Sequence, residues 1–243
     1  MRPDLIERVE AARRVVETLR PGAWELCLLD ASPDGRAAVE FRLGSERVVA
    51  KLLSNGDGER TFRLLQAIEE SATETLRVPH AIAWCPEPRA LLTERAAGEP
   101  CRAIDPARAT AALARIGRAL RELHALALPA GPPRTFGDHL AELIRPAPDA
   151  LAEAYPAQAG RIRETLERLR AEAAAWGARA DVPIHRDFHL RQLFDDGRHI
   201  TVLDWEDAAT GDPAFDVGYF TAYLKTHHAA HDAEAGIAAF RSG

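Results

Sequence analysis

The sequence predicts an α+β protein in which a β-rich N-terminal part precedes a longer and mainly helical part. Two patterns support this fold class. Short apolar runs separated by turn residues fill much of residues 24–93, whereas apolar residues recur every three or four positions over most of the remaining chain. Because elements of unlike class are grouped along the chain, we expect two lobes, at residues 1–95 and 96–243.

Seven elements are expected in the first lobe. Pro21-Gly22 ends a helical apolar spacing that begins near Asp4, a candidate N-cap. Pro33-Asp34-Gly35 and Gly44-Ser45 then separate three strands that form a meander of hairpins. The expected elements are a helix at 4–20, strands at 24–29, 37–43 and 47–53, a helix at 58–71, and strands at 81–85 and 90–93.

The second lobe combines helices with one hairpin. Amphipathic spacing predicts helices at 106–126 and 157–176, and a hairpin interrupts them near 183–205. Asp212-Pro213 then opens a further helix, because Asp is a good N-cap and Pro suits the first helical position. The final residues, Arg241-Ser242-Gly243, follow an apolar helical pattern closely, so we expect a lobe that is cut short.

Composition and charge exclude several classes of protein. The chain has 243 residues, 47% hydrophobic and 28% charged, as is typical of soluble globular proteins. No apolar run approaches the roughly 20 residues of a membrane span. The net charge of −6 argues against a nucleic-acid partner. Three scattered cysteines without metal-type spacing indicate reduced thiols in a cytoplasmic protein.

The hairpin at 183–205 carries the residues with the clearest chemistry. A turn at Asp196-Gly197 pairs Phe194 with His199 and Gln192 with Thr201. Continuing this ladder brings the second strand's end back to the loop that precedes the first strand.

The ends of that hairpin gather oxygen ligands. Asp187, Gln192 and Asp204 would lie around one small space, and two carboxylates with an amide oxygen suit Mg²⁺. A metal-dependent hydrolase is an alternative, because His185, Asp187 and His189 would share one face of an extended strand and could bind Zn²⁺.

Several motifs in this region resemble those of one family. His185-Arg186-Asp187, followed five residues later by Gln192, resembles the H-x-D-x-x-x-x-N catalytic loop of protein-kinase-like folds. Leu203-Asp204-Trp205 resembles the metal-binding segment of small-molecule kinases. Gly211-Asp212-Pro213 with Asp216 resembles the G-D-P-x-x-D signature of aminoglycoside phosphotransferases. The chain is therefore similar to the aminoglycoside phosphotransferase and choline kinase family.

This resemblance implies a protein-kinase-like fold, with a small antiparallel β-rich lobe and a larger helical lobe. It also implies an ATP-dependent phosphotransferase, whose acceptor is a hydroxyl group of an aminoglycoside-like compound, an amino alcohol or a sugar. Asp187 would be the catalytic carboxylate, and Asp204 and Gln192 would hold Mg²⁺. Gln192 stands where the family has Asn. His185, Asp212 and Asp216 are implied to be structural supports.

By the same resemblance, the first lobe holds ATP. Lys51 follows Val48-Val49-Ala50 as in the third strand of kinases, and it would reach the α- and β-phosphates. Its implied partner is Glu59, with Glu69 or Glu70 as a substitute.

Two further segments would surround the nucleotide. The first hairpin, with Ser32 and Gly35, would cover the phosphates, and the backbone of Thr93, Glu94 and Arg95 would pair with the adenine edge. Gly35 is the only glycine of that hairpin, and Gln192 departs from Asn. Both features favour, as a second alternative, a pseudokinase that binds nucleotide without turnover.

Overall fold

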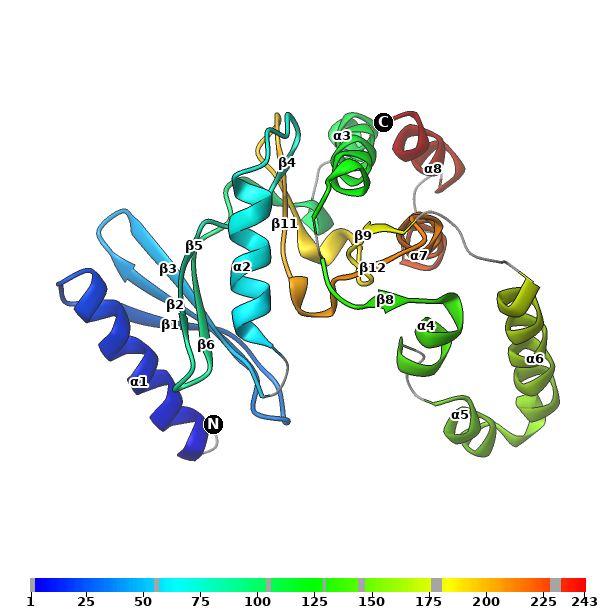
Figure 1. Cartoon of the computed structure of the whole chain (residues 1–243), viewed down its shortest axis with the longest axis horizontal. Coiled ribbons are helices and arrows are strands. Elements are labelled where there is room, and N and C mark those ends of the chain that lie inside the picture. Colours follow the sequence, from blue (N-terminus) through cyan, green and yellow to red (C-terminus); the bar gives the residue numbers. More distant parts are fainter. Residues whose placement is uncertain are drawn as a thin grey trace.

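The computed structural model describes residues 3–54, 57–103, 106–128, 130–143, 147–175, 181–227 and 233–243. A sheet-rich N-terminal part and a helix-rich C-terminal part lie side by side (Figure 1). The predicted α+β fold class, with a small antiparallel lobe and a larger helical lobe, is therefore confirmed. Within the described ranges, no helix combines the length and apolar character needed to cross a membrane.

The N-terminal part is built on a five-stranded antiparallel sheet of order β1-β2-β3-β6-β5. Its register pairs Lys51 with Ala38 on one side and with Leu91 on the other. The strands lie within two residues of the predicted positions, because clear turn residues separate them. They are β1 (Glu25–Ala31), β2 (Ala37–Leu43), β3 (Glu46–Leu52), β5 (Ala81–Cys85) and β6 (Ala90–Glu94).

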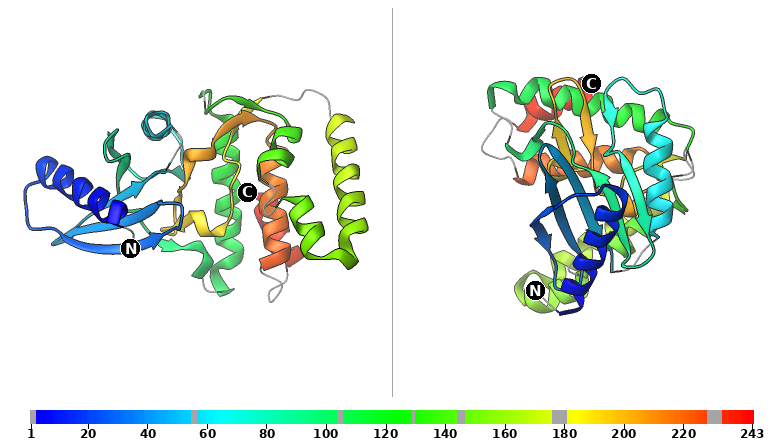
Figure 2. Two further views of the ribbon diagram at one scale, coloured as in Figure 1. Left: turned by 90° about the horizontal axis from the view of Figure 1, so that it is seen from below. Right: turned by 90° about the vertical axis from the view of Figure 1, so that its left-hand side faces the viewer.

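Two helices accompany this sheet. Helix α1 (Pro3–Leu19) packs on β2 and β3 through a stripe that includes Leu5, Val9 and Val16. Helix α2 (Gly58–Glu69) contacts β5 and β6. Figure 2 shows the two helices beside the strands from two further directions.

Short strands connect the two parts in a way that the sequence did not predict. Strand β4 (Leu76–Arg77) pairs in parallel with β11 (Ile200–Val202), which belongs to the predicted hairpin. Strand β11 pairs on its other side with β10 (Leu193–Asp195), and β10 in turn pairs with β7 (Glu99–Pro100). A third sheet contains β8 (Pro133–Arg134), β12 (Ala209–Gly211) and β9 (Val182–Ile184). Strand β4 lies before residue 95 in the sequence, but its partner β11 lies after it. The lobe boundary at residue 95 therefore stays a prediction.

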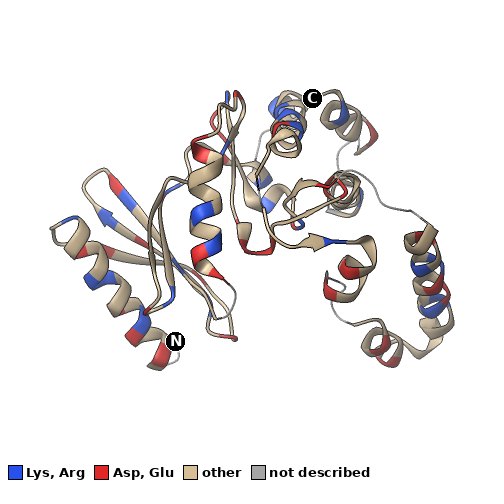
Figure 3. Cartoon of the chain, viewed as in Figure 1, with Lys and Arg blue, Asp and Glu red and all other residues tan. Residues whose placement is uncertain are grey.

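The C-terminal part contains helices at both predicted and unpredicted positions. Helices α4 and α5 lie between the predicted helices at 106–126 and 157–176, where the sequence analysis predicted no element. Helix α6 buries no residue, and acidic and basic residues are interspersed along it at the edge of the molecule (Figure 3). The α-helices are α3 (Pro106–Ala125), α4 (Phe136–Leu143), α5 (Pro148–Ala154), α6 (Ala159–Ala175), α7 (Ala214–His227) and α8 (Ala233–Ser242), and the 3₁₀ turns are η1 (Cys101–Ala103), η2 (Pro156–Gln158), η3 (Leu190–Gln192) and η4 (Trp205–Asp207).

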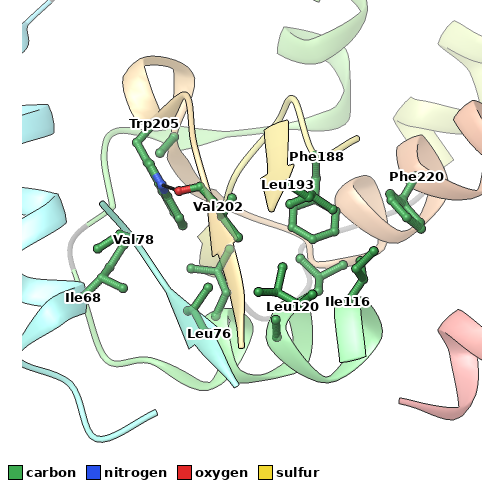
Figure 4. Packing of buried hydrophobic residues seen from close by; sticks show 14 of the residues in the cluster. Ile68, Leu76, Val78, Ile116, Leu120, Phe188, Leu193, Val202, Trp205 and Phe220 are labelled. Carbon is green, nitrogen blue, oxygen red and sulfur yellow. Dashed lines mark hydrogen bonds between the residues drawn. The ribbon is translucent and has the colours of Figure 1, made fainter. Parts of the chain in front are cut away.

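A hydrophobic cluster supports the hairpin and its flanking loops (Figure 4). Phe188 and Phe220 are fully buried, and their ring centroids lie 5.5 Å apart. Trp205 is buried in the same cluster, and its indole N–H donates to the carbonyl of Val202 at 2.8 Å. Residues adjacent to Asp187 and Asp204 are thus anchored in the core, which holds both loops in place.

Candidate active site

The hairpin β10–β11 has a register two residues away from the predicted one. Phe194 pairs with Thr201 rather than with His199. The ladder then continues with the amide of Leu203, which donates to the carbonyl of Gln192 at 2.8 Å. Gln192 therefore lies beside the Leu203-Asp204 segment and not beside Thr201.

The turn explains this difference. The carboxylate of Asp196 accepts hydrogen bonds from the amides of Arg198, at 2.8 Å, and of His199, at 2.6 Å. Gly197 has φ 92°, a left-handed conformation that favours glycine. The two central turn residues are therefore Gly197 and Arg198, one position later than the predicted Asp196-Gly197.

The corrected register brings the predicted carboxylates together. The side-chain amide of Gln192 donates to Oδ2 of Asp187 at 3.2 Å and to Oδ2 of Asp204 at 2.7 Å. The ammonium of Lys51 bonds to Asp204 and lies 2.7 Å from Oε2 of Glu206. Residues from β3, η3 and the loops beside the hairpin thus meet at one point.

Glu206 is a member of this group that the sequence analysis missed. Burial, together with a hydrogen bond to Asp204, raises the pKa of Glu206 to about 7. Burial also opposes the charged form of Asp204, but the hydrogen bond with Glu206 and the charge of Lys51 outweigh it and lower the pKa of Asp204. Burial opposes the charge of Lys51, yet both carboxylates outweigh that effect and raise its pKa. The group therefore favours a charged Lys51–Asp204 pair.

The backbone around the two aspartates is unusual. Arg186 and Asp204 have φ values of 71° and 70°, which are left-handed conformations for residues other than glycine. Each such conformation costs about 1–3 kcal/mol and persists only where surrounding contacts enforce it. His185 provides one such contact, because its fully buried ring lies with Nε2 2.7 Å from the carbonyl of Leu203.

Asp216 holds the loop that carries Asp187. Its fully buried carboxylate accepts hydrogen bonds from the amides of His185 and Arg186, both at 2.8 Å. His124 of α3 lies 3.1 Å from the same side chain. Asp212, the other expected support, accepts from the amide of Ala214 at 2.8 Å at the start of α7.

We expect Asp216→Asn to destabilise the fold by about 2–4 kcal/mol, because a buried carboxylate with two amide donors is replaced by a neutral amide. For a chain of this length the midpoint of thermal unfolding should fall by about 2–4 °C per kcal/mol. Differential scanning calorimetry measures this change. The exposed Asp30→Asn is the matched control, and equal melting temperatures for both variants would contradict the support role.

Arg186 connects the same loop to α4. Its guanidinium donates to Nδ1 of His139 at 3.0 Å and to Oε2 of Glu142 at 2.5 Å. Burial, followed by the charge of Arg186, lowers the pKa of His139 to about 4, so this imidazole is a neutral acceptor at pH 7. Helix α4, absent from the predicted elements, is thus attached directly to the candidate catalytic loop.

Lys51 does not pair with Glu59 as predicted. Glu59 has an exposed side chain and pairs with Arg63 on the same helix at 2.5 Å. The first substitute, Glu69, pairs with His80 at 2.7 Å, and the second, Glu70, forms the C-cap of α2. The apolar stripe of α2 explains the correction, because it turns Glu59 away from the sheet.

Arg60, the neighbour of Glu59, points to the site instead. Its guanidinium donates to the carbonyls of Ala130 at 2.7 Å, Ala208 at 2.9 Å and Glu206 at 2.7 Å. Helix α2 is therefore attached to the segment after Asp204 through a cation and three backbone oxygens.

We expect Arg60→Met to lower the free energy of unfolding by about 2–4 kcal/mol, because three carbonyls lose a charged donor. Urea denaturation measures the loss. Arg63→Met removes an exposed arginine one turn along the same helix and should change stability by less than about 0.5 kcal/mol. A similar loss in both variants would show that Arg60 has no special role.

The predicted phosphate loop lies at the end of the sheet where Lys51 lies, since β2 begins at Ala37 opposite Leu52. Its amides are engaged within the turn. The amide of Ser32 donates to the carbonyl of Arg36 at 2.9 Å, and the amide of Gly35 donates to the carbonyl of Ser32 at 3.1 Å. In this conformation, neither amide is directed to a ligand.

The backbone of the predicted adenine segment is also partly engaged. Thr93 pairs with Val49 and Ala81 inside the sheet. The amide of Glu94 donates to the carbonyl of His80 at 2.9 Å, and that of Arg95 donates to the carbonyl of Arg47 at 3.4 Å. An adenine ring would therefore have to use other groups than these two amides.

The geometry does not favour the zinc hydrolase alternative. Nδ1 of His185 accepts from the amide of Asp187 at 3.3 Å, and its Nε2 faces the carbonyl of Leu203. Nδ1 of His189 accepts from the amide of Arg191 at 3.2 Å. In the part of the chain that the structure describes, no group of three or more His, Cys, Asp or Glu side chains is arranged to hold a metal ion.

Comparison with known proteins gives a consistent result. Residues 33–242 match the sequence profile of the phosphotransferase enzyme family. No curated protein is similar enough to the sequence to be matched.

Solved structures share the fold at low sequence identity. The type VIII aminoglycoside-3'-phosphotransferase has 19% identity and a TM-score of 0.69, over 98% of this chain and 90% of that chain. The choline kinase LicA from Streptococcus pneumoniae has 11% identity and a TM-score of 0.70, over 96% and 80%. The spectinomycin phosphotransferase APH(9)-Ia, in complex with ADP and spectinomycin, has 10% identity and a TM-score of 0.68, over 96% and 79%. These likenesses show a kinase-like fold.

Proposed function

The chain belongs to the phosphotransferase enzyme family, and on this premise we propose that it transfers the γ-phosphate of ATP to a hydroxyl group of a small molecule. One observation carries the proposal. Lys51, Asp187, Gln192 and Asp204 come from separate segments and converge through direct hydrogen bonds.

Asp187 is the proposed catalytic residue. Its carboxylate accepts a hydrogen bond from the acceptor hydroxyl and orients that oxygen toward the γ-phosphorus. Its Oδ2 is held by Gln192 at 3.2 Å, on the side of Asp204, so its other oxygen is the one that faces the acceptor. Lys51 binds the α- and β-phosphates in this proposal, and Asp204 and Glu206 compete for its ammonium when no nucleotide is bound.

The donor set fits Mg²⁺. This cation is usually held by one or two carboxylates together with substrate phosphates, and Asp204 with Glu206 provides such a pair. Gln192 directs its nitrogen toward both aspartates, so a half-turn of its side-chain amide is needed to present its oxygen as a ligand. When bound, the ion supplies neutralisation of the phosphate oxygens.

The acceptor panel follows from the relatives. Hygromycin B, spectinomycin and choline are named with solved structures of this fold, so these three compounds belong in the first screen. A cytoplasmic location is consistent with ATP as the donor. Homoserine and simple sugars extend the panel to other hydroxyl compounds.

The test is ATP consumption with Mg²⁺ across that panel, followed by mass spectrometry of the phosphorylated product. We expect one acceptor class to raise ADP release above the rate with water alone. ATP-induced thermal stabilisation without turnover on any acceptor would instead support the pseudokinase. Absence of nucleotide binding would overturn the proposal altogether.

A further inference from the structure

Tyr219 contacts the proposed catalytic carboxylate on the side away from Asp204. Its phenol donates a hydrogen bond to Oδ1 of Asp187 at 3.0 Å, whereas Oδ2 accepts from Gln192 at 3.2 Å. Nε2 of His189 lies 3.4 Å from the same Oδ1. Both oxygens of the carboxylate therefore have a donor, and rotation of the group about its Cβ–Cγ bond would break two hydrogen bonds.

The position of Tyr219 follows from α7. Asp216 and Tyr219 are three residues apart and so share one face of the helix. Asp216 bonds to the amides on the N-terminal side of Asp187, and Tyr219 bonds to the side chain of Asp187 itself. One helical turn thus fixes both the backbone and the carboxylate of the candidate catalytic residue.

The phenol is held in place and stays protonated. The ring of Tyr219 stacks with Phe215 and with His189, at centroid distances of 6.2 and 6.3 Å. Burial, followed by the negative charge of Asp187, raises the pKa of Tyr219 to about 12, so it is a hydrogen-bond donor at neutral pH. The residue is 36% exposed, so part of its side chain is accessible to solvent.

We propose that Tyr219 is a positioning residue, which holds Oδ1 of Asp187 so that the acceptor hydroxyl meets a carboxylate of fixed orientation. The inference rests on the proposed phosphotransferase function. It assigns to Tyr219 a role that no motif in the sequence indicated. The competing explanation is that the ring only packs on α7 and the phenol is incidental.

Tyr219→Phe separates these explanations, because it keeps the ring and removes the donor. We expect kcat for the best acceptor of the screen to fall about tenfold, the equivalent of one hydrogen bond to a charged group. The Kd for ATP and the melting temperature should stay unchanged. Tyr223→Phe is the matched control, since Tyr223 stacks on His189 at 5.0 Å in the same cluster and should retain wild-type kcat.

A second substitution tests the proton of the phenol. Replacing Tyr219 by 3-fluorotyrosine keeps the donor at neutral pH but lets it ionise at lower pH. We expect neutral-pH turnover to be restored relative to Tyr219→Phe, with an alkaline loss of kcat that begins at lower pH than in the wild type. If Tyr219 only packs on α7, the alkaline loss of kcat should begin at the same pH in both proteins.

The outcomes are distinguishable. Undiminished kcat in Tyr219→Phe, or an equal loss in Tyr223→Phe, overturns the positioning role while the wild type still turns over. A wild-type protein that neither binds ATP nor phosphorylates any acceptor overturns the proposed function, and the role of Tyr219 with it.

Discussion

Replacing Asp187 by Asn is expected to reduce phosphoryl transfer by about 10²–10⁴-fold, because the acceptor hydroxyl loses the carboxylate that orients it and accepts its hydrogen bond. The side chain keeps its size, and Tyr219 can still donate to the remaining amide oxygen. The loss should therefore appear in kcat, with little change in the Kd for ATP. Coupled ADP release and calorimetric ATP titration measure the two quantities.

The control for this variant is Asp149→Asn, in the first turn of α5. It removes one negative charge from an exposed position and should retain wild-type kcat. Turnover that survives in Asp187→Asn, while Asp149→Asn behaves as the wild type, would exclude Asp187 as the catalytic residue. A loss of ATP affinity equal to the loss of kcat would instead show that Asp187 acts in nucleotide binding.

Local sequence signals predicted the N-terminal sheet well. Gly44-Ser45 and Pro33-Asp34-Gly35 separate β1, β2 and β3, and residues between such turns have few alternatives to an extended conformation. The same reasoning placed Lys51 on a strand. Strands of two residues, such as β4, could not be predicted, because their only signal is a partner more than a hundred residues away.

Side-chain partners were harder to predict than elements. The Glu59 assignment failed because helix phase, set by the buried Leu64, Leu65 and Ile68, decides which residue points inward. Arg60 is the residue that points inward. It donates to backbone carbonyls, and because every residue has one, the sequence does not indicate which of them would be its partners. Such contacts become visible only after the lobes are packed together.

The register of the β10–β11 hairpin was the other feature that the sequence did not predict correctly. The hairpin position was right, but the choice of turn residues shifted the predicted pairing by two positions. The carboxylate of Asp196 accepts hydrogen bonds from two following amides, and these bonds select the central residues of the turn. A prediction from the Asp-Gly dipeptide alone does not take such bonds into account. Because a shift of two keeps each side chain on its face, the grouping of Asp187 with Asp204 survived the error.

Asp204→Asn should also reduce phosphoryl transfer, by about 10²–10³-fold. Unlike Asp187→Asn, it should act through the binding of Mg²⁺ and not through the orientation of the acceptor hydroxyl. With the charge removed, we expect Mg²⁺ to lose its effect on ATP affinity, because the proposed ligand pair is reduced to Glu206. Calorimetric titration of ATP with and without Mg²⁺ measures this difference.

Lys51→Met is the informative partner variant, since Lys51 bonds to both Asp204 and Glu206. Without the ammonium, ATP should bind more weakly at every Mg²⁺ concentration, while the gain in affinity on adding Mg²⁺ persists. The two variants thus separate metal binding from direct phosphate binding within one ion-paired cluster. If Asp204→Asn kept the full effect of Mg²⁺ on ATP affinity, Asp204 would be excluded as a ligand of the ion.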